Sequence, residues 1–578
     1  MNLASLAMYC VRLQLLLVLL ACASTADPRR SDVPGPDVLT ARVDSVFADI
    51  RHDAPGCAVG AYRNGELVLA KGYGLANVED GRRITSRTAF DLGSASKQFT
   101  ALAVLMLDEQ HRLSLDDDVR RYVPELPDYG IPVRVRDLMQ HTSGLRDYGS
   151  LDILVGRETK TMADFLALLA RQQRLNLTPG TQHEYSHSDF ELLGLIVERV
   201  VHEPFGAYLE REVLRPLGMT GSRVHDGRAA KVPQRAFGHA RLKDGFRVVF
   251  NNSEIAGGGN LYTSIEDLRH WDRALAEGAS GRRPLVARML TRPTLPSGDT
   301  IAYAYGVRKG RYRGLPTVFR GGHSNGMRTE IIRFPDQQFA VATLCNGDHL
   351  WAGQRAERVA DVYLGNLMQP RRPPYTPPPA VPISTAELQR YTGVYQSPGQ
   401  LDLSRIALLD GKLVELLGDT AQSFTYRGDG VFTGDGIPGD FRLAFARNAS
   451  GTMRMDHVSE GDVGVTWERM PDSAVFRPDS VSLSDYAATY FSEELDAIWQ
   501  LAVRNGNLVL QRPGRADRPV TPMKRDTFSR HFGLWNEAVV ASLVFGRDSA
   551  GRITEFTLTT PPGADVVRDL RFVRVPSR

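Results

Sequence analysis

The sequence Asp91-Leu92-Gly93-Ser94-Ala95-Ser96-Lys97-Gln98-Phe99-Thr100 runs directly into the apolar stretch Ala101 to Leu107. From Ser96 onward the apolar residues recur with the i, i+3, i+4 spacing of a buried helix. Ser94 lies at the N-terminal edge of this helix, and Lys97 lies three residues later on the same face. A buried lysine can lose its proton and activate a serine hydroxyl, and unpaired N–H groups at a helix start can bind an oxyanion. The stretch therefore predicts a serine acyl-transfer site.

The Ser-x-x-Lys pattern has an ordinary alternative. A serine that caps a helix, followed by a solvated lysine on the first turn, gives the same pattern without any chemistry. This is the only such pattern in the chain, so its context has to decide between the two interpretations.

Length and composition limit the function classes. A chain of 578 residues predicts several domains, and its 42% hydrophobic and 24% charged residues are ordinary for a globular protein. A formal net charge of +3 over this length is not the basic excess that is typical of a nucleic-acid-binding protein. We therefore expect a small-molecule partner and no nucleic acid.

The first 26 residues form a predicted targeting segment. Arg12 supplies the charge, Leu13 to Ala23 the apolar core, and small residues the cleavage site. The apolar run is too short to span a bilayer comfortably. Leu19-Leu20-Ala21-Cys22 also resembles a lipoprotein cleavage box, which leaves open a lipid anchor at Cys22. We expect a periplasmic or secreted protein that contacts the membrane only through such an anchor.

The remaining cysteines and the metal-ligand spacings point to no cofactor. Cys57 and Cys345 lie far apart in apolar, strand-like stretches and are expected to be two buried thiols. The acidic run Asp116-Asp117-Asp118 is typical of a solvated helix start, and no zinc-type spacing occurs. The predicted chemistry needs neither a metal nor an organic cofactor.

Two further stretches carry polar residues next to predicted helices. His141, in His141-Thr142-Ser143-Gly144-Leu145, is expected to be structural rather than catalytic. Tyr185 lies just before the helical stretch Leu192 to Val201, where its phenol could relay a proton. A core tyrosine with a satisfied hydroxyl is the alternative for Tyr185.

Two glycine-containing motifs do not fit the chemistry that they suggest. Gly322-His323-Ser324-Asn325-Gly326 matches the Gly-x-Ser-x-Gly nucleophile elbow, but a strand pair follows it instead of a helix. Ser324 is therefore not expected to be a nucleophile. The run Gly257-Gly258-Gly259-Asn260 lacks a following Lys-Ser/Thr, so phosphate binding is not expected.

Taken together, these stretches resemble the penicillin-recognising serine hydrolases, which include class C β-lactamases, D,D-carboxypeptidases, D-aminopeptidases and esterases. The resemblance covers about Asp37 to Leu367. It rests on Gly93-Ser94-x-Ser96-Lys97-x-Phe99-Thr100, His141-Thr142-Ser143-Gly144-Leu145, Tyr185-Ser186, Leu192-Leu193-Gly194 and Gly322-His323-Ser324. It implies an α/β sandwich in which helices cover an antiparallel sheet and a helical lobe closes the cleft.

The resemblance also implies roles for single residues. Ser94 would be the acylated nucleophile, Lys97 its base partner, and Tyr185 the proton relay. His323 would take the place of the lysine of the family's Lys-Thr-Gly motif. Backbone N–H groups of Ser94 and Gly326 would form the oxyanion hole.

Two departures from the family pattern affect substrate binding. The family's Tyr-x-Asn reads Tyr185-Ser186-His187, so an imidazole replaces the amide that contacts substrate. The family's His-x-Gly reads His323-Ser324-Asn325, which puts a side chain where substrate usually lies close to the strand. His187 and Asn325 are therefore expected at the substrate, and both changes weaken the case for a true β-lactamase.

The C-terminal third contains an internal repeat. After a proline-dense linker at 370–382, seven residues recur at a constant offset of 95. These are Leu388, Tyr391, Tyr395, Ser397, Gly411, Leu413 and Val414, repeated as Leu483, Tyr486, Tyr490, Ser492, Gly506, Leu508 and Val509. Turn signals separate strand-like stretches in both copies, which predicts two small antiparallel β-barrels.

The predicted organisation is a signal peptide at 1–26, a β-lactamase-like serine hydrolase domain at 27–369, the linker, and barrels at 383–471 and 472–578. This layout resembles the D-aminopeptidase branch. The leading hypothesis is a secreted serine hydrolase that cleaves small amides or esters, such as D-amino-acid peptides and peptidoglycan-derived fragments. A β-lactamase or esterase of the same fold, and an inactive binding protein that uses its barrels, are the alternatives.

Overall fold

The computed structural model describes residues 36–576, apart from 157, 228–231, 251, 280, 282, 372–374, 398–402, 418–419, 438–440, 460–461, 513–514, 535–536 and 561–565. The predicted signal peptide, with Cys22, lies outside these residues.

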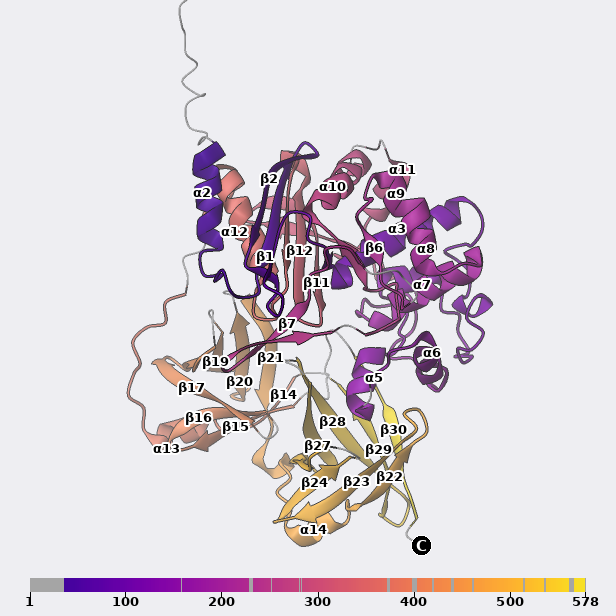
Figure 1. The fold of residues 1–578 in the computed structure, drawn as a ribbon. Coiled ribbons are helices and arrows are strands. Elements are labelled where there is room, and N and C mark those ends of the chain that lie inside the picture. Colours follow the sequence, from indigo (N-terminus) through magenta and orange to yellow (C-terminus); the bar gives the residue numbers. More distant parts are fainter. Residues whose placement is uncertain are drawn as a thin grey trace, which may run out of the picture.

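A six-stranded antiparallel sheet forms the centre of the N-terminal domain, with the strand order β10-β11-β12-β13-β1-β2 (Figure 1). β1 and β2 form a hairpin at Asn64-Gly65, a typical hairpin-turn sequence, and both residues have positive φ. β1 also pairs with β13, so the two ends of this domain's sequence lie side by side. The strands are β1 (Cys57–Arg63), β2 (Glu66–Tyr73), β10 (Arg308–Tyr312), β11 (Leu315–Ser324), β12 (Met327–Phe334) and β13 (Phe339–Cys345).

Helices cover both faces of this sheet. α2 (Pro36–Val46) and α12 (Ala352–Leu364) pack on one face and share a buried apolar cluster with it. α10 (Ile265–Ala279) packs on the opposite face, followed outward by a helical lobe (Figure 1). The helices on this side also include α3 (Lys97–Glu109), α4 (Val135–Gln140), α5 (Tyr148–Val155), α6 (Met162–Ala170), α7 (His187–Val201), α8 (Phe205–Leu209), α9 (Arg215–Leu217) and α11 (Pro284–Met289).

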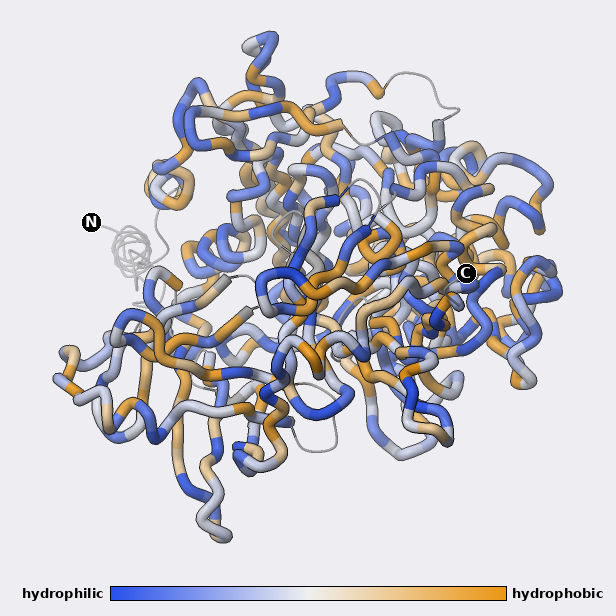
Figure 2. The backbone as a smooth tube through the Cα atoms, turned by 90° about the horizontal axis from the view of Figure 1, so that it is seen from below, coloured by the Kyte–Doolittle hydropathy of each residue, from blue (hydrophilic) through white to orange (hydrophobic). Residues whose placement is uncertain are grey.

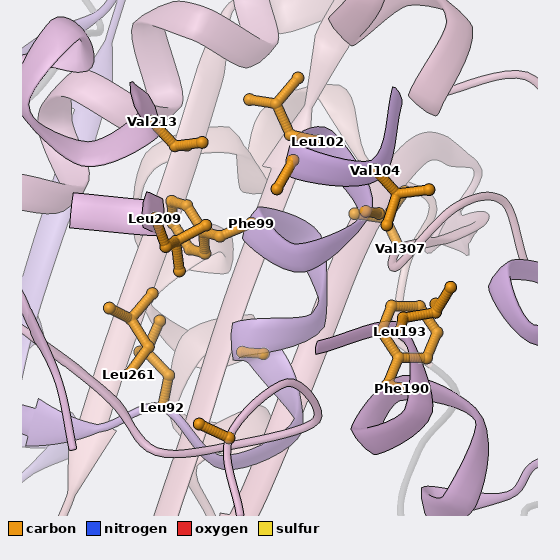
Figure 3. Packing of buried hydrophobic residues seen from close by; sticks show 14 of the residues in the cluster. Leu92, Phe99, Leu102, Val104, Phe190, Leu193, Leu209, Val213, Leu261 and Val307 are labelled. Carbon is orange, nitrogen blue, oxygen red and sulfur yellow. The ribbon is translucent and has the colours of Figure 1, made fainter. Parts of the chain in front are cut away.

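The helical lobe is organised around α3, as the periodicity after Ser96 predicts. Figure 3 shows Phe99 and Leu102 of α3 among apolar side chains from other elements, including Phe190 and Leu193 of α7. Leu92, which precedes the nucleophile turn, belongs to the same cluster. The core therefore fixes the segment that carries Ser94 and Lys97.

Short strands link the sheet to the lobe. They are β3 (Leu75–Asn77), β4 (Arg82–Arg83), β5 (Phe90–Asp91), β6 (Arg223–Val224), β7 (Gly238–Leu242), β8 (Gly245–Val249) and β9 (Leu261–Thr263). β9 pairs with both β5 and β6, which holds the residues just before Ser94 in a small three-stranded sheet.

The structure corrects the prediction of two free buried thiols. Cys57 and Cys345 are direct partners on the neighbouring strands β1 and β13, and their Sγ atoms form a disulfide. The two residues are 288 positions apart, so only the pairing of these strands brings them together. Composition and spacing could not reveal that pairing.

The first C-terminal unit is the predicted barrel. Its eight antiparallel strands close completely, because the first strand also pairs with the last. They are β14 (Gly393–Gln396), β15 (Leu403–Leu409), β16 (Lys412–Leu417), β17 (Thr420–Gly428), β18 (Val431–Gly434), β19 (Arg442–Arg447), β20 (Met453–Ser459) and β21 (Asp462–Arg469). The short helix α13 (Thr385–Leu388) precedes it.

The second unit is a nine-stranded sheet that nearly closes into a barrel. Its edge strands, β25 and β26, are consecutive in the chain. The strands are β22 (Ala488–Ser492), β23 (Ala497–Arg504), β24 (Asn507–Gln511), β25 (Arg518–Pro519), β26 (Thr521–Lys524), β27 (Thr527–Leu534), β28 (Glu537–Arg547), β29 (Ile553–Thr559) and β30 (Leu570–Arg574), after α14 (Ser480–Ser484).

The predicted repeat is visible as a shared hydrogen bond. The Tyr395 hydroxyl donates to the Tyr391 carbonyl at 2.6 Å, and the Tyr490 hydroxyl donates to the Tyr486 carbonyl at 3.0 Å. Both donors are fully buried in their barrels. The fold class is therefore confirmed, whereas the domain boundaries at 370–382 and 471/472 stay predictions.

No helix in the described part of the chain is long and apolar enough to cross a membrane. Hydrophobic and hydrophilic residues are interspersed along the backbone, as Figure 2 shows.

Candidate active site

Ser94 lies in a single 3-10 turn, Gly93–Ser96, that leads directly into α3. Gly93 has φ +53, and a Cβ at this position would lie 2.8 to 2.9 Å from backbone atoms of His323. Only glycine tolerates both the left-handed conformation and this close approach. Strand β11 therefore passes directly against the turn that carries the nucleophile.

Lys97 is fully buried beneath Ser94. Its Nζ donates to Ser94 Oγ at 3.1 Å and to the Gly258 carbonyl at 2.8 Å. The N–H of Gly258 donates in turn to the buried carboxyl of Glu191 at 3.0 Å. The glycine run that was not expected to bind phosphate thus holds the lysine in place, and the same geometry excludes the solvated-lysine alternative for Lys97.

Tyr185, two residues before α7, contacts the nucleophile. Its hydroxyl lies 2.8 Å from Ser94 Oγ and accepts a hydrogen bond from Arg320 Nη2 at 3.0 Å. Burial raises the pKa of this phenol, but the positive charges of Lys97 and Arg320 outweigh burial and lower the pKa to about 7. The phenolate is therefore well populated at neutral pH, which a core tyrosine with an ordinary pKa would not allow.

Arg320 is a basic side chain that contacts both Ser94 and Tyr185. Along β11, successive side chains alternate between the two faces of the sheet. Arg320 lies on the Ser94 face, where its Nε donates to the Ser94 carbonyl at 3.1 Å. His323 is an odd number of residues further on and pairs with Arg328, so it belongs to the opposite face and is exposed. His323 nevertheless lines the same cleft as Ser94, and the role predicted for it stays a prediction.

A signal for Arg320 was present in the sequence. Arg320-Gly321-Gly322 has the basic-x-Gly spacing of the family motif, three residues before His323. Gly322 meets the need for glycine there, because a Cβ at this position would lie 1.8 Å from the Leu92 carbonyl oxygen. A shift of three residues reverses the face of a strand, which is why the two assignments differ so strongly.

The other two predicted substrate-contact residues, His187 and Asn325, differ in their surroundings. His187 is near the site: its ring lies edge-on to Tyr185, with centroids 5.2 Å apart, and its Nδ1 is 3.0 Å from the buried Asp147 carboxylate. Asn325 is exposed in the turn between β11 and β12. It does not line the cleft described below.

Gly326 lies in the turn between β11 and β12. It packs against β7, since a Cβ there would be 2.4 Å from the His239 backbone nitrogen. The β11 backbone that runs beside the nucleophile is that of Gly322 and His323. The expected pairing of Ser94 with Gly326 in an oxyanion hole stays a prediction, and the backbone of His323 is a second candidate beside Ser94.

Two residues from the sequence analysis have structural partners. His141 is fully buried, with Nδ1 2.8 Å from Asp189 and Nε2 3.2 Å from the Tyr303 hydroxyl. Burial lowers the pKa of His141 and raises that of Asp189. Ser324, the serine of the Gly-x-Ser-x-Gly pattern, donates a hydrogen bond to the Asp91 carboxylate at 2.8 Å, which is not one of the groups Ser94, Lys97 and Tyr185.

Ser94, Tyr185 and Arg320 line a cleft of about 840 Å³. Polar, charged and glycine residues dominate its lining, which is Ser94, Gln182, His183, Glu184, Tyr185, Arg308, Arg320, Gly321, Gly322, His323, Arg328, Thr329, Glu330, Trp351, Ala352, Gly353 and Arg568. Arg568 comes from the second barrel and was not predicted. Among the described residues, no group of three metal-ligating side chains is arranged to hold an ion.

The profile of the beta-lactamase family matches residues 38–364, which is 327 of 578 residues and more than half of the chain. The chain belongs to the beta-lactamase family. The serine, lysine and tyrosine at the cleft agree with this assignment, and the chain is a serine hydrolase of this family.

Known relatives and one solved structure extend the comparison beyond the catalytic domain. A D-aminopeptidase of Brucella melitensis biotype 2 is 24% identical over 530 residues, 88% of this chain and 94% of that protein. A D-aminopeptidase of Gluconobacter oxydans is 26% identical over 372 residues, 62% of this chain and 68% of that protein. The octameric penicillin-binding protein homologue from Pyrococcus abyssi, at 21% identity and TM-score 0.52, covers 83% of this chain and 99% of its own and shares the fold.

Proposed function

We propose that this protein is an exported serine hydrolase that forms an acyl-enzyme on Ser94 and cleaves small amides or esters such as D-amino-acid peptides. The observation that carries this is the convergence of Tyr185 and Lys97 on Ser94 Oγ, at 2.8 and 3.1 Å. Similarity to D-aminopeptidases over the barrels as well as the catalytic domain supports the substrate class.

The hydrogen-bond directions favour Tyr185 as the base for acylation. Lys97 and Arg320 have only N–H donors, so Lys97 donates to Ser94 Oγ and Arg320 donates to the phenolic oxygen. The Ser94 proton is then directed to the Tyr185 phenolate. Loss of this proton frees the Oγ electron pair to form a bond with the substrate carbonyl carbon.

The remaining steps use the same groups. Backbone N–H groups of Ser94 and His323 are proposed to stabilise the oxyanion of the tetrahedral intermediate. As this intermediate collapses, the scissile C–N or C–O bond breaks and Tyr185 returns its proton to the leaving atom. Tyr185 then takes a proton from a water molecule, and the resulting hydroxide adds to the carbonyl carbon of the Ser94 ester. The Oγ–carbon bond breaks, Tyr185 returns its proton to Ser94 Oγ, and the acid is released.

Two features support export. The first 26 residues have the pattern of a signal peptide, and disulfides such as Cys57–Cys345 persist in oxidising compartments. A lipid anchor at Cys22 remains part of this proposal, because the Leu-Leu-Ala-Cys pattern supports it.

The test compares the mature protein with Ser94→Ala on D-alanine p-nitroanilide, p-nitrophenyl butyrate and nitrocefin. Turnover of the anilide that disappears in the variant supports the proposed substrate class. Turnover of the ester or of nitrocefin alone redirects the proposal to an esterase or a β-lactamase. Turnover that survives in Ser94→Ala contradicts the proposed nucleophile, and no turnover of any substrate favours the binding-protein alternative.

A further inference from the structure

The second barrel docks on the helical lobe beside the cleft. Leu151, Leu154 and Leu168 of the lobe belong to the same buried apolar cluster as the interior of this barrel. The fully buried Arg146 side chain forms an ion pair with Glu494 at 2.5 Å. A buried, paired contact of this kind fixes the barrel relative to the catalytic domain.

This interface holds Arg568 at the rim of the cleft. The Arg568 N–H donates to Asn176 Oδ1 at 2.9 Å, and its carbonyl accepts from Arg146 Nη2 at 2.8 Å. Its guanidinium donates to Glu184 at 3.1 Å, and the side chain remains about one-third exposed. Because Glu184 immediately precedes Tyr185, the barrel delivers a cation next to the proposed proton relay.

Positive charge predominates in the cleft. Its lining has four arginines, Arg308, Arg320, Arg328 and Arg568, against the carboxyl groups of Glu184 and Glu330. Burial, reinforced by the negative charge of Glu357, raises the pKa of Glu330 to about 8 although Arg320 opposes the shift. Glu330 is thus mostly neutral at neutral pH, and Glu184 compensates only one of the arginines.

Three of these cations gather on the Tyr185 side of the nucleophile. Arg320 contacts the phenol and Arg568 contacts Glu184. Arg308 lines the same cleft, and its charge acts on His183 and Tyr303, whose rings stack on each other. In the proposed reaction Tyr185 protonates the leaving atom, so the leaving group must lie on this side. Guanidinium groups bind carboxylates through paired, charge-assisted hydrogen bonds.

We propose that Arg568 is a specificity residue of the Ser94 site and that, together with Arg308, it binds a carboxylate on the leaving group of the substrate. The reaction then releases a carboxylate-bearing product such as a free amino acid. This inference rests on the proposed hydrolase function, but it adds the second barrel to the site and defines the charge of the leaving group.

The test uses two butyrate esters whose leaving groups differ only in a carboxylate, 4-nitrophenol and 3-carboxy-4-nitrophenol. We compare the ratio of their kcat/KM values among full-length wild type, Arg568→Ala, Arg568→Lys and Arg571→Ala. Intrinsic reactivity cancels when these ratios are compared between variants. Arg571 lies on β30, is exposed and pairs with Glu555, so Arg571→Ala is a matched loss of charge away from the cleft.

We expect Arg568→Ala to lower the preference for the carboxylated ester on the order of 10- to 100-fold, the range of one charge-assisted hydrogen bond. Arg568→Lys should retain part of the preference and Arg571→Ala all of it. The same ratio in wild type and Arg568→Ala would overturn the inference while leaving the hydrolase function intact. A measurement independent of turnover is the calorimetric binding of the two free phenols to Ser94→Ala and to the Ser94→Ala/Arg568→Ala double variant. If the carboxylated phenol bound both variants with the same affinity, the inference would also be overturned.

Discussion

Replacing Arg320 by methionine should move the pH dependence of the reaction, because Arg320 helps to stabilise the Tyr185 phenolate. The fall of the Tyr185 pKa from 10.0 to about 7 corresponds to roughly 4 kcal/mol in favour of the anion. Two cations produce most of this fall, and the Arg320 Nη2–phenol distance is 3.0 Å. At an effective dielectric constant of 20, one such charge contributes a few kcal/mol.

Loss of Arg320 should therefore raise the Tyr185 pKa by one to two pH units and lower kcat/KM at pH 7 by about 5- to 50-fold, as the phenolate fraction falls. The sign follows from the charge: with fewer cations the phenolate forms only at higher pH, so activity should recover as the pH approaches 9. Arg320→Lys retains the charge and should give a smaller displacement. The control is Arg311→Met, which removes an exposed arginine of β10 whose guanidinium donates to the Gly314 carbonyl.

The measurement is kcat/KM for p-nitrophenyl butyrate between pH 5 and 10, corrected for spontaneous hydrolysis. An Arg320→Met profile that is lower than wild type by the same factor at every pH would refute the reasoning, because it would assign Arg320 a role without influence on the phenol. A profile identical to that of wild type would refute it as well.

Three further predictions concern single contacts. Ser324→Ala should keep kcat/KM within about tenfold of wild type, because Ser324 donates to Asp91 and not to the reacting groups; a loss as large as that of Ser94→Ala would contradict this. Gly322→Ala should lower kcat at least 100-fold, since its Cβ would lie 1.8 Å from the Leu92 carbonyl oxygen and displace β11, whereas Gly365→Ala, with no atom within 4 Å, should behave as wild type. Dithiothreitol or Cys57→Ser should lower the thermal unfolding midpoint, with a loss of about 2–4 kcal/mol, and an unchanged midpoint in reductant would contradict a stabilising role of the disulfide.

Local patterns predicted the parts of the site that one segment builds by itself. The 3-10 turn and α3 place Ser94 above Lys97 because both residues lie on one continuous helical path, which periodicity reveals. The strands on both sides of Asn64-Gly65 and the repeated tyrosines of the barrels could be predicted for the same reason.

Features that depend on contacts between distant segments could not be predicted in this way. The contact of Arg320 with Tyr185 could not be predicted, because a motif match carries no information on which face of β11 a side chain occupies. The disulfide depends on the pairing of β1 with β13, and the position of Arg568 depends on the docking of the second barrel. The spacing of residues in the sequence indicates neither this strand pairing nor the docking of the barrel.

The position of β1 in the central sheet also has a consequence for the order of folding. β1 lies between β2, its neighbour in sequence, and β13, whose residues are synthesised almost 300 positions later. Until β13 is available, the β1 edge of the β1–β2 hairpin is unpaired and Cys57 lacks its partner. Such long-range pairing slows folding, and the exposed edge must be kept from other strands until β13 arrives. During biosynthesis, this domain should therefore depend on chaperones more than a domain built from local contacts.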